Sequence, residues 1–259
     1  MIRDVLCDLD GVLWRAEEPI DGSVEALSIL ASEGARLWFI TNNSNRPVRD
    51  YEDRLEAMGL DANSRVLTSA RAAASLVEPS MTAMACAGPG VWEELEQRGV
   101  RTVGADRPQL DVDVVVVGLH RDFDYARLNH ASAAVRHGAR LIGTNSDNTF
   151  PTPQGAEPGG GSILAAVAAA SSTTPILAGK PEEPMAQLVY SMIGRSGPLT
   201  DTIMIGDRPS TDGRFAERLG VDFWMVGETL SGEDHVSVPI ARSGPDLRHI
   251  VDSRGVGGR

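Results

Sequence analysis

Residues 5–14 read VLCDLDGVLW, a short apolar run that ends in two aspartates and a glycine. The apolar part is typical of a buried strand, and Gly11 indicates a sharp turn directly after it. We therefore predict a strand at 5–9 whose carboxyl end carries Asp8 and Asp10. Ligands of open parallel sheets bind outside the carboxyl ends of the strands, so these carboxylates are the first candidate site residues.

Short β-rich runs alternate with helical segments along the whole chain, which is typical of an α/β protein with a parallel sheet. Besides the first strand, the pattern predicts strands at 36–40, 81–87, 113–119, 140–144, 175–179, 202–206 and 223–226. Helices are expected at 23–33, 47–58 and 163–170. Residues 144–162 are rich in Asn, Pro and Gly, and they predict a loop long enough to have a function.

The 259 residues include 24 Lys and Arg against 36 Asp and Glu, a formal net charge of −12. This acidity argues against non-specific binding to nucleic acids or membrane surfaces, because both are polyanionic. The sequence contains no apolar stretch of about 18 residues, so no transmembrane helix is expected. Cys7 and Cys86 lack the spacing of a metal or redox motif. We therefore expect a soluble, cytoplasmic protein with reduced cysteines.

Polar residues follow the carboxyl ends of three other predicted strands. They are Thr41, Asn42, Lys180, Asp207 and, slightly further on, Asp212. Because the carboxyl ends of parallel strands share one edge of a sheet, we expect these side chains to converge with Asp8 and Asp10. A single Asp at a strand end could equally well cap the following helix, but the whole set is much harder to explain in that way.

The chemistry of this set favours phosphoryl transfer. Grouped carboxylates repel one another and need a cation, and a site with only oxygen ligands favours Mg²⁺. A metal and an ammonium also reduce the repulsion that a carboxylate meets when it attacks a phosphate ester. Asp8 can then form an aspartyl-phosphate, and Asp10 can protonate the leaving alkoxide and later deprotonate water. The candidate ammonium, Lys180, is the only lysine in the sequence, beside 23 arginines.

Four motifs appear in order: DLDGVLW at 8–14, TNNS at 41–44, GKP at 179–181 and GDRPSTD at 206–212. With these motifs the sequence resembles the haloacid dehalogenase (HAD) superfamily of phosphohydrolases, specifically its NagD / p-nitrophenyl-phosphatase-like branch. The resemblance implies an α/β fold in which a Rossmann-like parallel-sheet core carries an inserted, smaller α/β cap domain. Gly213 and the pair Pro209-Ser210 depart from the usual fourth motif, but they flank its acidic positions without replacing them.

The resemblance also implies a role for each motif residue. Asp8 is the expected nucleophile, Asp10 the general acid/base, and Lys180 the residue that contacts the phosphate and stabilises its charge. The expected phosphate ligands beside Lys180 are Thr41, Asn42 and Asn43. The expected magnesium ligands are Asp8, the backbone carbonyl of Asp10, and Asp207, with Asp212 in support.

The spacing of the motifs locates an insertion. Asp10 and Thr41 are 31 positions apart and Lys180 and Asp207 are 27 apart, which is room for one helix and one strand each. The 137 positions from Asn43 to Lys180 far exceed one crossover. We therefore expect a core at 1–79 plus 175–259 and a cap at 80–174. This cap position argues against the sugar phosphomutases of the superfamily, and a lone receiver domain has no such insertion.

The cap is expected to exclude water and to contact the substrate. Candidate contacts are His120, Arg121 and the segment 145–149, which resembles the TNPD-type segment of the family although Ser146 replaces the usual proline. A solvated loop is the alternative for this segment. The three glycines at 159–161 precede a helix but lack the lysine of a P-loop, so a flexible helix start is favoured over a phosphate site.

The sequence is therefore interpreted as a magnesium-dependent phosphatase of a small phosphomonoester, acting through an aspartyl-phosphate. Phosphoglycolate, glycerol phosphate, nucleotides, pyridoxal phosphate and sugar phosphates are all used within the branch, with p-nitrophenyl phosphate as a substrate in vitro. Two alternatives stay open: a catalytically idle phosphoester-binding or sensing protein, and a phosphotransferase or mutase with the same intermediate. The resemblance also implies a homodimer joined through the cap.

Overall fold

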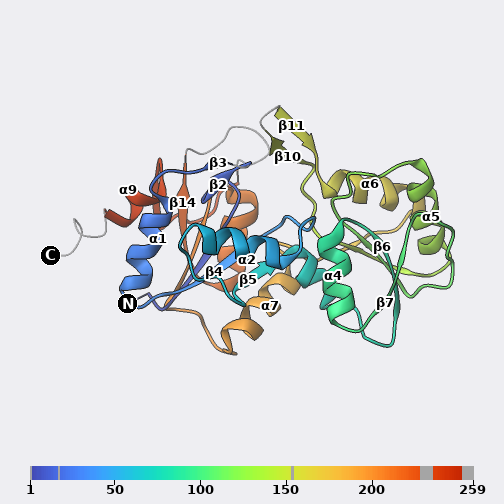
Figure 1. Cartoon of the computed structure of the whole chain (residues 1–259), viewed down its shortest axis with the longest axis horizontal. Coiled ribbons are helices and arrows are strands. Elements are labelled where there is room, and N and C mark those ends of the chain that lie inside the picture. The colour runs from blue at the N-terminus through green and yellow to red at the C-terminus, as the bar shows by residue number, and fades with distance from the viewer. Residues whose placement is uncertain (1, 17, 153–154, 228–235, 253–259) are drawn as a thin grey trace. The chain divides into compact units, whose positions relative to one another are not determined.

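The first predicted strand lies inside a six-stranded sheet of the computed structural model (Figure 1), which describes residues 2–16, 18–152, 155–227 and 236–252. The chain divides into two compact units. Unit 1 comprises Met1–Thr41, Tyr51–Leu67 and Val189–Arg259, and unit 2 comprises Asn42–Asp50 and Thr68–Leu188. Each unit contains its own largely parallel sheet with helices between the strands, which confirms the predicted α/β class.

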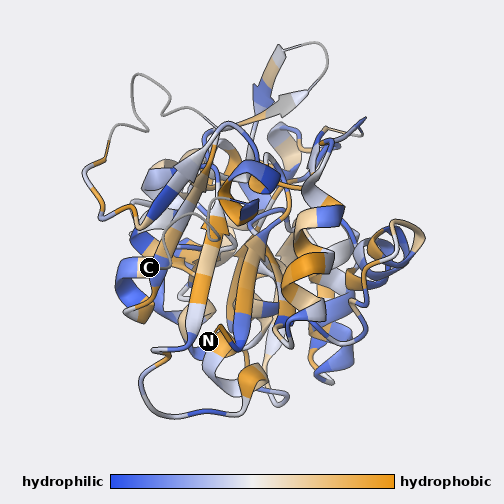
Figure 2. Cartoon of the chain, turned by 90° about the vertical axis from the view of Figure 1, so that its left-hand side faces the viewer, coloured by the Kyte–Doolittle hydropathy of each residue, from blue (hydrophilic) through white to orange (hydrophobic). Residues whose placement is uncertain are grey.

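The sheet of unit 1 has the strand order β15-β14-β13-β1-β4-β5. Its strands are β1 (Asp4–Asp8), β4 (Arg36–Thr41), β5 (Val66–Thr68), β13 (Thr202–Gly206), β14 (Asp222–Val226) and β15 (Arg242–Gly244). Strand β1 pairs in parallel with β13 on one side and β4 on the other, and its five residues are all buried. Figure 2 shows hydrophobic residues along much of these central strands. Burial on both faces explains why the apolar residues of β1 are consecutive instead of alternating.

Helices α1 (Ser23–Ser32) and α9 (Leu247–Asp252) of unit 1 pack against each other. Helix α1 buries Ser23, Ala26, Leu27 and Leu30, whose spacing is that of one helical face. The remaining elements of unit 1 are strands β2 (Trp14–Arg15) and β3 (Glu18–Pro19), a π-helical turn (Pro209–Gly213) and α8 (Arg214–Leu219). Helices α2 (Val48–Ala57) and α7 (Glu183–Ile193) each contain residues of both units.

The sheet of unit 2 has the order β12-β9-β8-β6-β7, and its strands pair in parallel. The strands are β6 (Thr82–Cys86), β7 (Arg101–Gly104), β8 (Val114–Val117), β9 (Arg140–Gly143) and β12 (Ile176–Leu177). The helices are α3 (Ser69–Ala74), α4 (Pro89–Gln97), α5 (Tyr125–Arg136) and α6 (Gly160–Ser171). Alternate residues of β8, Val115 and Val117, share a buried core with Ala131 of α5 and Val167 of α6, and these two helices lie side by side.

The predicted strands are confirmed with small shifts at their ends, except that the run at 175–179 is reduced to the two residues of β12. The loop prediction for 144–162 was wrong in part. This segment contains an antiparallel pair, β10 (Thr149–Thr152) and β11 (Gly155–Pro158), and α6 already begins at Gly160. The prolines of both strands and the Gly, Ala and Glu of β11 concealed the pair, because these residue types are depleted in most strands. Within the described ranges, no helix combines the length and apolar composition needed to cross a membrane.

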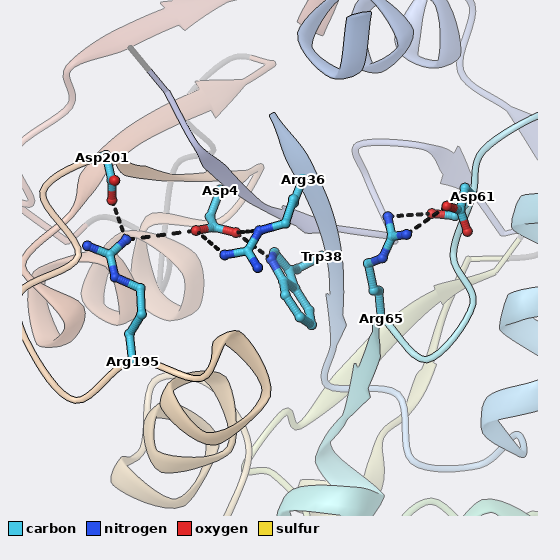
Figure 3. A network of polar contacts seen from close by, with 7 residues as sticks. All are labelled: Asp4, Arg36, Trp38, Asp61, Arg65, Arg195 and Asp201. Atoms are coloured by element: carbon cyan, nitrogen blue, oxygen red, sulfur yellow. Dashed lines mark hydrogen bonds and ion pairs between the residues drawn. The ribbon is translucent and has the colours of Figure 1, made fainter. Parts of the chain in front are cut away.

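The amino end of β1 carries a buried carboxylate that the sequence analysis did not single out. Asp4 is fully buried, and Figure 3 shows the groups that surround it. The guanidinium of Arg36 donates to Asp4 at 2.9 Å, the indole N–H of Trp38 donates to it at 2.8 Å, and Arg195 lies 3.9 Å away. These donors satisfy the charge at the end of the strand opposite to Asp8, so Asp4 has a structural role.

Candidate active site

The carboxyl end of β1 places Asp8 and Asp10 at the edge of the unit 1 sheet. Asp8 is the last residue of the strand and is buried, whereas Asp10 is half-buried in the turn that follows. Thr41 ends the neighbouring strand β4 and is also buried. The strand-end pattern expected from the sequence is therefore present for these three residues.

Three carboxylates come together at this edge. One oxygen each of Asp8, Asp207 and Asp212 lies within 4.8 Å of the other two. Asp207 follows β13, and Asp212 lies in the π-helical turn, where it is fully buried and accepts a hydrogen bond from the backbone N–H of Arg208 at 3.1 Å. Such a cluster of negative charge is costly to bury unless a cation or a proton compensates it.

Two glycines make this clustering sterically feasible. A Cβ on Gly11 would lie 1.9 Å from a carboxylate oxygen of Asp207, and a Cβ on Gly206 would lie 2.4 Å from the side chain of Asp212. Gly11 also has a φ of +89°, which other residues rarely adopt. An all-oxygen donor set of this size fits a hard divalent cation such as Mg²⁺.

Asp10 interacts with a residue of its own motif. The indole N–H of Trp14 donates to Asp10 Oδ1 at 3.0 Å, and the backbone N–H of Gly11 donates to the carbonyl of Trp14 at 2.7 Å. The guanidinium of Arg54 lies over the Trp14 ring, 4.0 Å from its centroid. Trp14 was quoted as part of the first motif, but its contact with Asp10 was not predicted.

Lys180, Asn42 and Asn43 belong to unit 2. The side-chain amide of Asn42 holds the backbone of Lys180: its Oδ1 accepts from the N–H of Lys180 at 2.8 Å, and its Nδ2 donates to the carbonyl of Lys180 at 3.0 Å. Nδ2 also donates to Asp147 at 3.2 Å. Asn43 caps its own turn by accepting from the backbone N–H of Asn45 at 3.1 Å. The amide of Asn42 is thus engaged by protein groups, and Lys180 is buried.

Two further side chains hold the backbone of Asn42, and one of them, Ser69, was missed by the sequence analysis. The carbonyl of Asn42 accepts from Ser69 Oγ and from the side-chain amide of Asn145, both at 2.6 Å. Asn145 in turn accepts from the backbone N–H of Asp147 at 3.0 Å. Asn145 and Asp147 lie in the segment that sequence analysis proposed for substrate contacts. In this structure both bind the second motif.

The other candidate contacts at 120–121 have local partners. Arg121 is exposed, forms an ion pair with Glu157 at 2.9 Å and lies over the ring of Phe150. Nδ1 of His120 accepts from the backbone N–H of Asp122 at 3.3 Å. Burial, and then the charge of Arg127, lowers the pKa of His120, so the neutral ring is favoured near pH 7. The three glycines at 159–161 form the N-cap and first turn of α6, as the helix-start interpretation predicted.

Comparison with known proteins adds two family matches. Residues 5–101 match the haloacid dehalogenase-like hydrolases, and residues 177–249 match a second, HAD-hydrolase-like family. Together the matches contain all four sequence motifs and leave 102–176 between them.

The similarity to three named relatives extends over nearly the whole chain. The acid sugar phosphatase of Staphylococcus epidermidis is 31% identical over 253 residues, 95% of each chain. The 5′-nucleotidase YutF of Bacillus subtilis is 28% identical over 255 residues, 97% of this chain and 95% of that protein. The crystal structure of a glycerol phosphate phosphatase from Mycobacterium tuberculosis in complex with magnesium has a TM-score of 0.82 and 28% identity, and the similarity covers 96% of this chain and 76% of that one.

Proposed function

Because this chain belongs to the haloacid dehalogenase-like hydrolases and is a phosphatase of their NagD / p-nitrophenyl-phosphatase-like branch, we propose that it hydrolyses a small phosphomonoester with the help of Mg²⁺. The observation that carries the proposal is the carboxylate cluster of Asp8, Asp207 and Asp212 at the carboxyl ends of β1 and β13. A site of this charge suits a divalent cation together with a phosphate dianion, because each compensates the other.

In the proposed reaction Asp8 attacks the phosphorus atom of the ester. A bond forms between a carboxylate oxygen of Asp8 and phosphorus, the bond from phosphorus to the ester oxygen breaks, and Asp10 gives its proton to the leaving oxygen. In the second half, Asp10 takes a proton from water, whose oxygen attacks the aspartyl-phosphate. Inorganic phosphate leaves, and Asp8 is regenerated as a carboxylate.

The other motif residues are proposed to hold the charge in place. Asp207 and Asp212 would complete the magnesium site with Asp8 and the backbone carbonyl of Asp10, and the bound ion would neutralise charge on the transferring phosphoryl group. Phosphate ligands and charge-stabilising donors are proposed to be Thr41, Asn42, Asn43 and Lys180. Since the amide of Asn42 is engaged with Lys180 and Asp147, its side chain would contribute by positioning the lysine.

We propose that residues 80–174 form the cap on a core of 1–79 plus 175–259, and that the cap selects the substrate. The named relatives are a 5′-nucleotidase, an acid sugar phosphatase and a glycerol phosphate phosphatase. A cytoplasmic location and a homodimer through the cap are likewise proposed; light scattering coupled to size exclusion would decide the oligomeric state.

A phosphate-release assay on these three classes of ester, with phosphoglycolate, pyridoxal phosphate and p-nitrophenyl phosphate, tests the proposal. Turnover should require Mg²⁺ and disappear with a chelator. Asp8→Asn should abolish turnover while circular dichroism remains native, and Asp21→Asn, at an exposed position, is the control.

Two results would replace this proposal by an alternative. Tight binding of esters without phosphate release from any of them would indicate a binding or sensing protein. Transfer of the phosphoryl group to an added alcohol or sugar in preference to water would indicate a phosphotransferase or mutase. Near-normal turnover of Asp8→Asn would exclude the covalent intermediate.

A further inference from the structure

The turn after β1 places an indole N–H against the proposed general acid. Trp14 begins strand β2, and its Nε1–H donates to Asp10 Oδ1 at 3.0 Å. The backbone of the turn is closed by the hydrogen bond from the N–H of Gly11 to the carbonyl of Trp14, at 2.7 Å. The side chain and the backbone of Trp14 therefore both fix the loop that carries Asp10.

Trp14 is itself held firmly. Its side chain is 1% exposed, so the ring belongs to the core and has little freedom to rotate. The Arg54 guanidinium lies 4.0 Å from the ring centroid, a close cation–π contact. A positive charge over the ring also withdraws electron density from the indole, which makes its N–H a better donor. Arg54 belongs to the part of helix α2 that lies in unit 1, so its contact with Trp14 joins α2 to the turn after β1.

This contact selects the oxygen of Asp10 that carries the proton. In a neutral carboxyl group the carbonyl oxygen is the better acceptor and the hydroxyl is the donor. A donor fixed at Oδ1 favours the carbonyl there and places the hydroxyl at Oδ2. The same contact disfavours rotation of the carboxyl group and so favours one direction for Oδ2 in both halves of the reaction.

We propose that Trp14 is a positioning residue that orients Asp10 for proton transfer to the leaving oxygen. The inference rests on the proposed function, in which Asp10 protonates the ester oxygen as its bond to phosphorus breaks and Asp8 forms the new bond to phosphorus. Arg54 supports the same arrangement by holding the ring. Neither residue touches the substrate in this assignment.

The test is the dependence of kcat/KM on the leaving group in Trp14→Phe. Phenylalanine keeps an aromatic ring beneath Arg54 and removes the N–H. An alkyl phosphate has a poor leaving group that needs a proton, whereas p-nitrophenolate leaves without one. We expect kcat/KM to fall about 10-fold or more for glycerol phosphate and less than about 3-fold for p-nitrophenyl phosphate, since general acid catalysis typically contributes about 100-fold or more.

The chain offers a matched control in Trp38→Phe. The indole of Trp38 also donates to an aspartate, Asp4, at 2.8 Å, but at the amino end of the sheet (Figure 3). Its replacement should lower both kcat/KM values equally or not at all. If Trp14→Phe does not fold, Arg54→Leu, which leaves the N–H in place, should still give a smaller selective loss for the alkyl ester.

A double variant separates this inference from the proposed function. In an Asp10→Asn background, Trp14→Phe should cause no further selective loss, because both changes remove the same step. Equal losses for both esters in Trp14→Phe, or an additional selective loss in the double variant, would overturn the role of Trp14 while the phosphatase proposal stands. A wild-type protein that releases no phosphate from either ester would instead refute the proposed function.

Discussion

At the scale of single residues, the surroundings of Lys180 restrict how its side chain can act. It is buried, and one side-chain amide, that of Asn42, binds both its backbone N–H and its carbonyl. A fixed backbone leaves only the four-carbon side chain to reach its target. Lysine delivers a compact charge at the end of that chain, whereas arginine is a broader planar fork with a different reach.

We therefore predict that Lys180→Arg loses activity although the net charge is unchanged. The loss in kcat should be about 100-fold or more, the effect of removing one preorganised donor. Steady-state phosphate release measures this loss of kcat. The control is the reverse exchange at an exposed position, Arg107→Lys, which should leave kcat unchanged. Turnover of Lys180→Arg within about 3-fold of the wild type would remove the lysine from the mechanism.

At the scale of elements, helices α3 and α4 pack together and share a partly buried ion pair. Arg71 Nε lies 3.2 Å from Glu94 Oε2, and Glu94 is 4% exposed. The other oxygen of Glu94 is buried without a hydrogen-bond partner in the described part of the chain. Burial raises the pKa of Glu94, and the charge of Arg71 only partly opposes this effect. The pair therefore links the packing of two helices to pH.

The sign of this linkage follows from proton counting. With a raised pKa in the folded state, folded Glu94 keeps its proton at pH values where the unfolded chain, which titrates near 4.5, has lost it. Folding stability contributed by Glu94 is therefore complete below pH 4.5 and declines as pH rises through the folded pKa. Glutamine has no proton to lose, so the stability of Glu94→Gln should lack this decline. The free energy of unfolding of the variant minus that of the wild type should therefore increase between pH 4.5 and pH 7. Urea titrations at several pH values measure it, with Glu96→Gln, at an exposed position of the same helix, as control; parallel pH profiles of Glu94→Gln and wild type would contradict the prediction.

The elements were predictable from sequence to different degrees for physical reasons. Strands β1, β4, β8 and β13 are buried, so their apolar runs are unambiguous. The strands β10 and β11 are only four residues long, each contains a proline, and none of their described side chains is fully buried, so the local pattern did not indicate strands. The candidate carboxylates could be named because strand ends share an edge. Two contacts could not be predicted from local pattern, because they depend on how the folded chain packs. They are the hydrogen bond from Trp14 to Asp10 and the hydrogen bonds between Asn42 and Lys180, which are 138 positions apart.

At the scale of the whole molecule, the proposed metal ligands are confined to one of the two units. Asp8, Asp207 and Asp212 all belong to unit 1, although about 200 positions separate the first from the others in sequence. Three carboxylates confined to a small volume repel one another, and a bound cation relieves this repulsion. A ligand that binds only the folded state stabilises it by RT ln(1 + [L]/Kd), so the stabilisation grows with the logarithm of the ligand concentration over Kd.

Mg²⁺ should therefore raise the free energy of unfolding of the wild type, by about 2.7 kcal/mol at 100 times Kd. Asp212→Asn should be more stable than the wild type in chelator, because one repelling charge is gone, and should gain less from Mg²⁺.

Hydrogen exchange should slow in β1 and β13 on adding Mg²⁺, with smaller changes in β8 of unit 2. Asp222→Asn, exposed in unit 1, is the control and should respond as the wild type does. If Mg²⁺ binds at the carboxylate cluster, its effects on hydrogen exchange and on the free energy of unfolding should be local to unit 1 and should depend on Asp212. Equal protection of both sheets, or a full stabilisation of Asp212→Asn by Mg²⁺, would therefore show that the ion binds elsewhere.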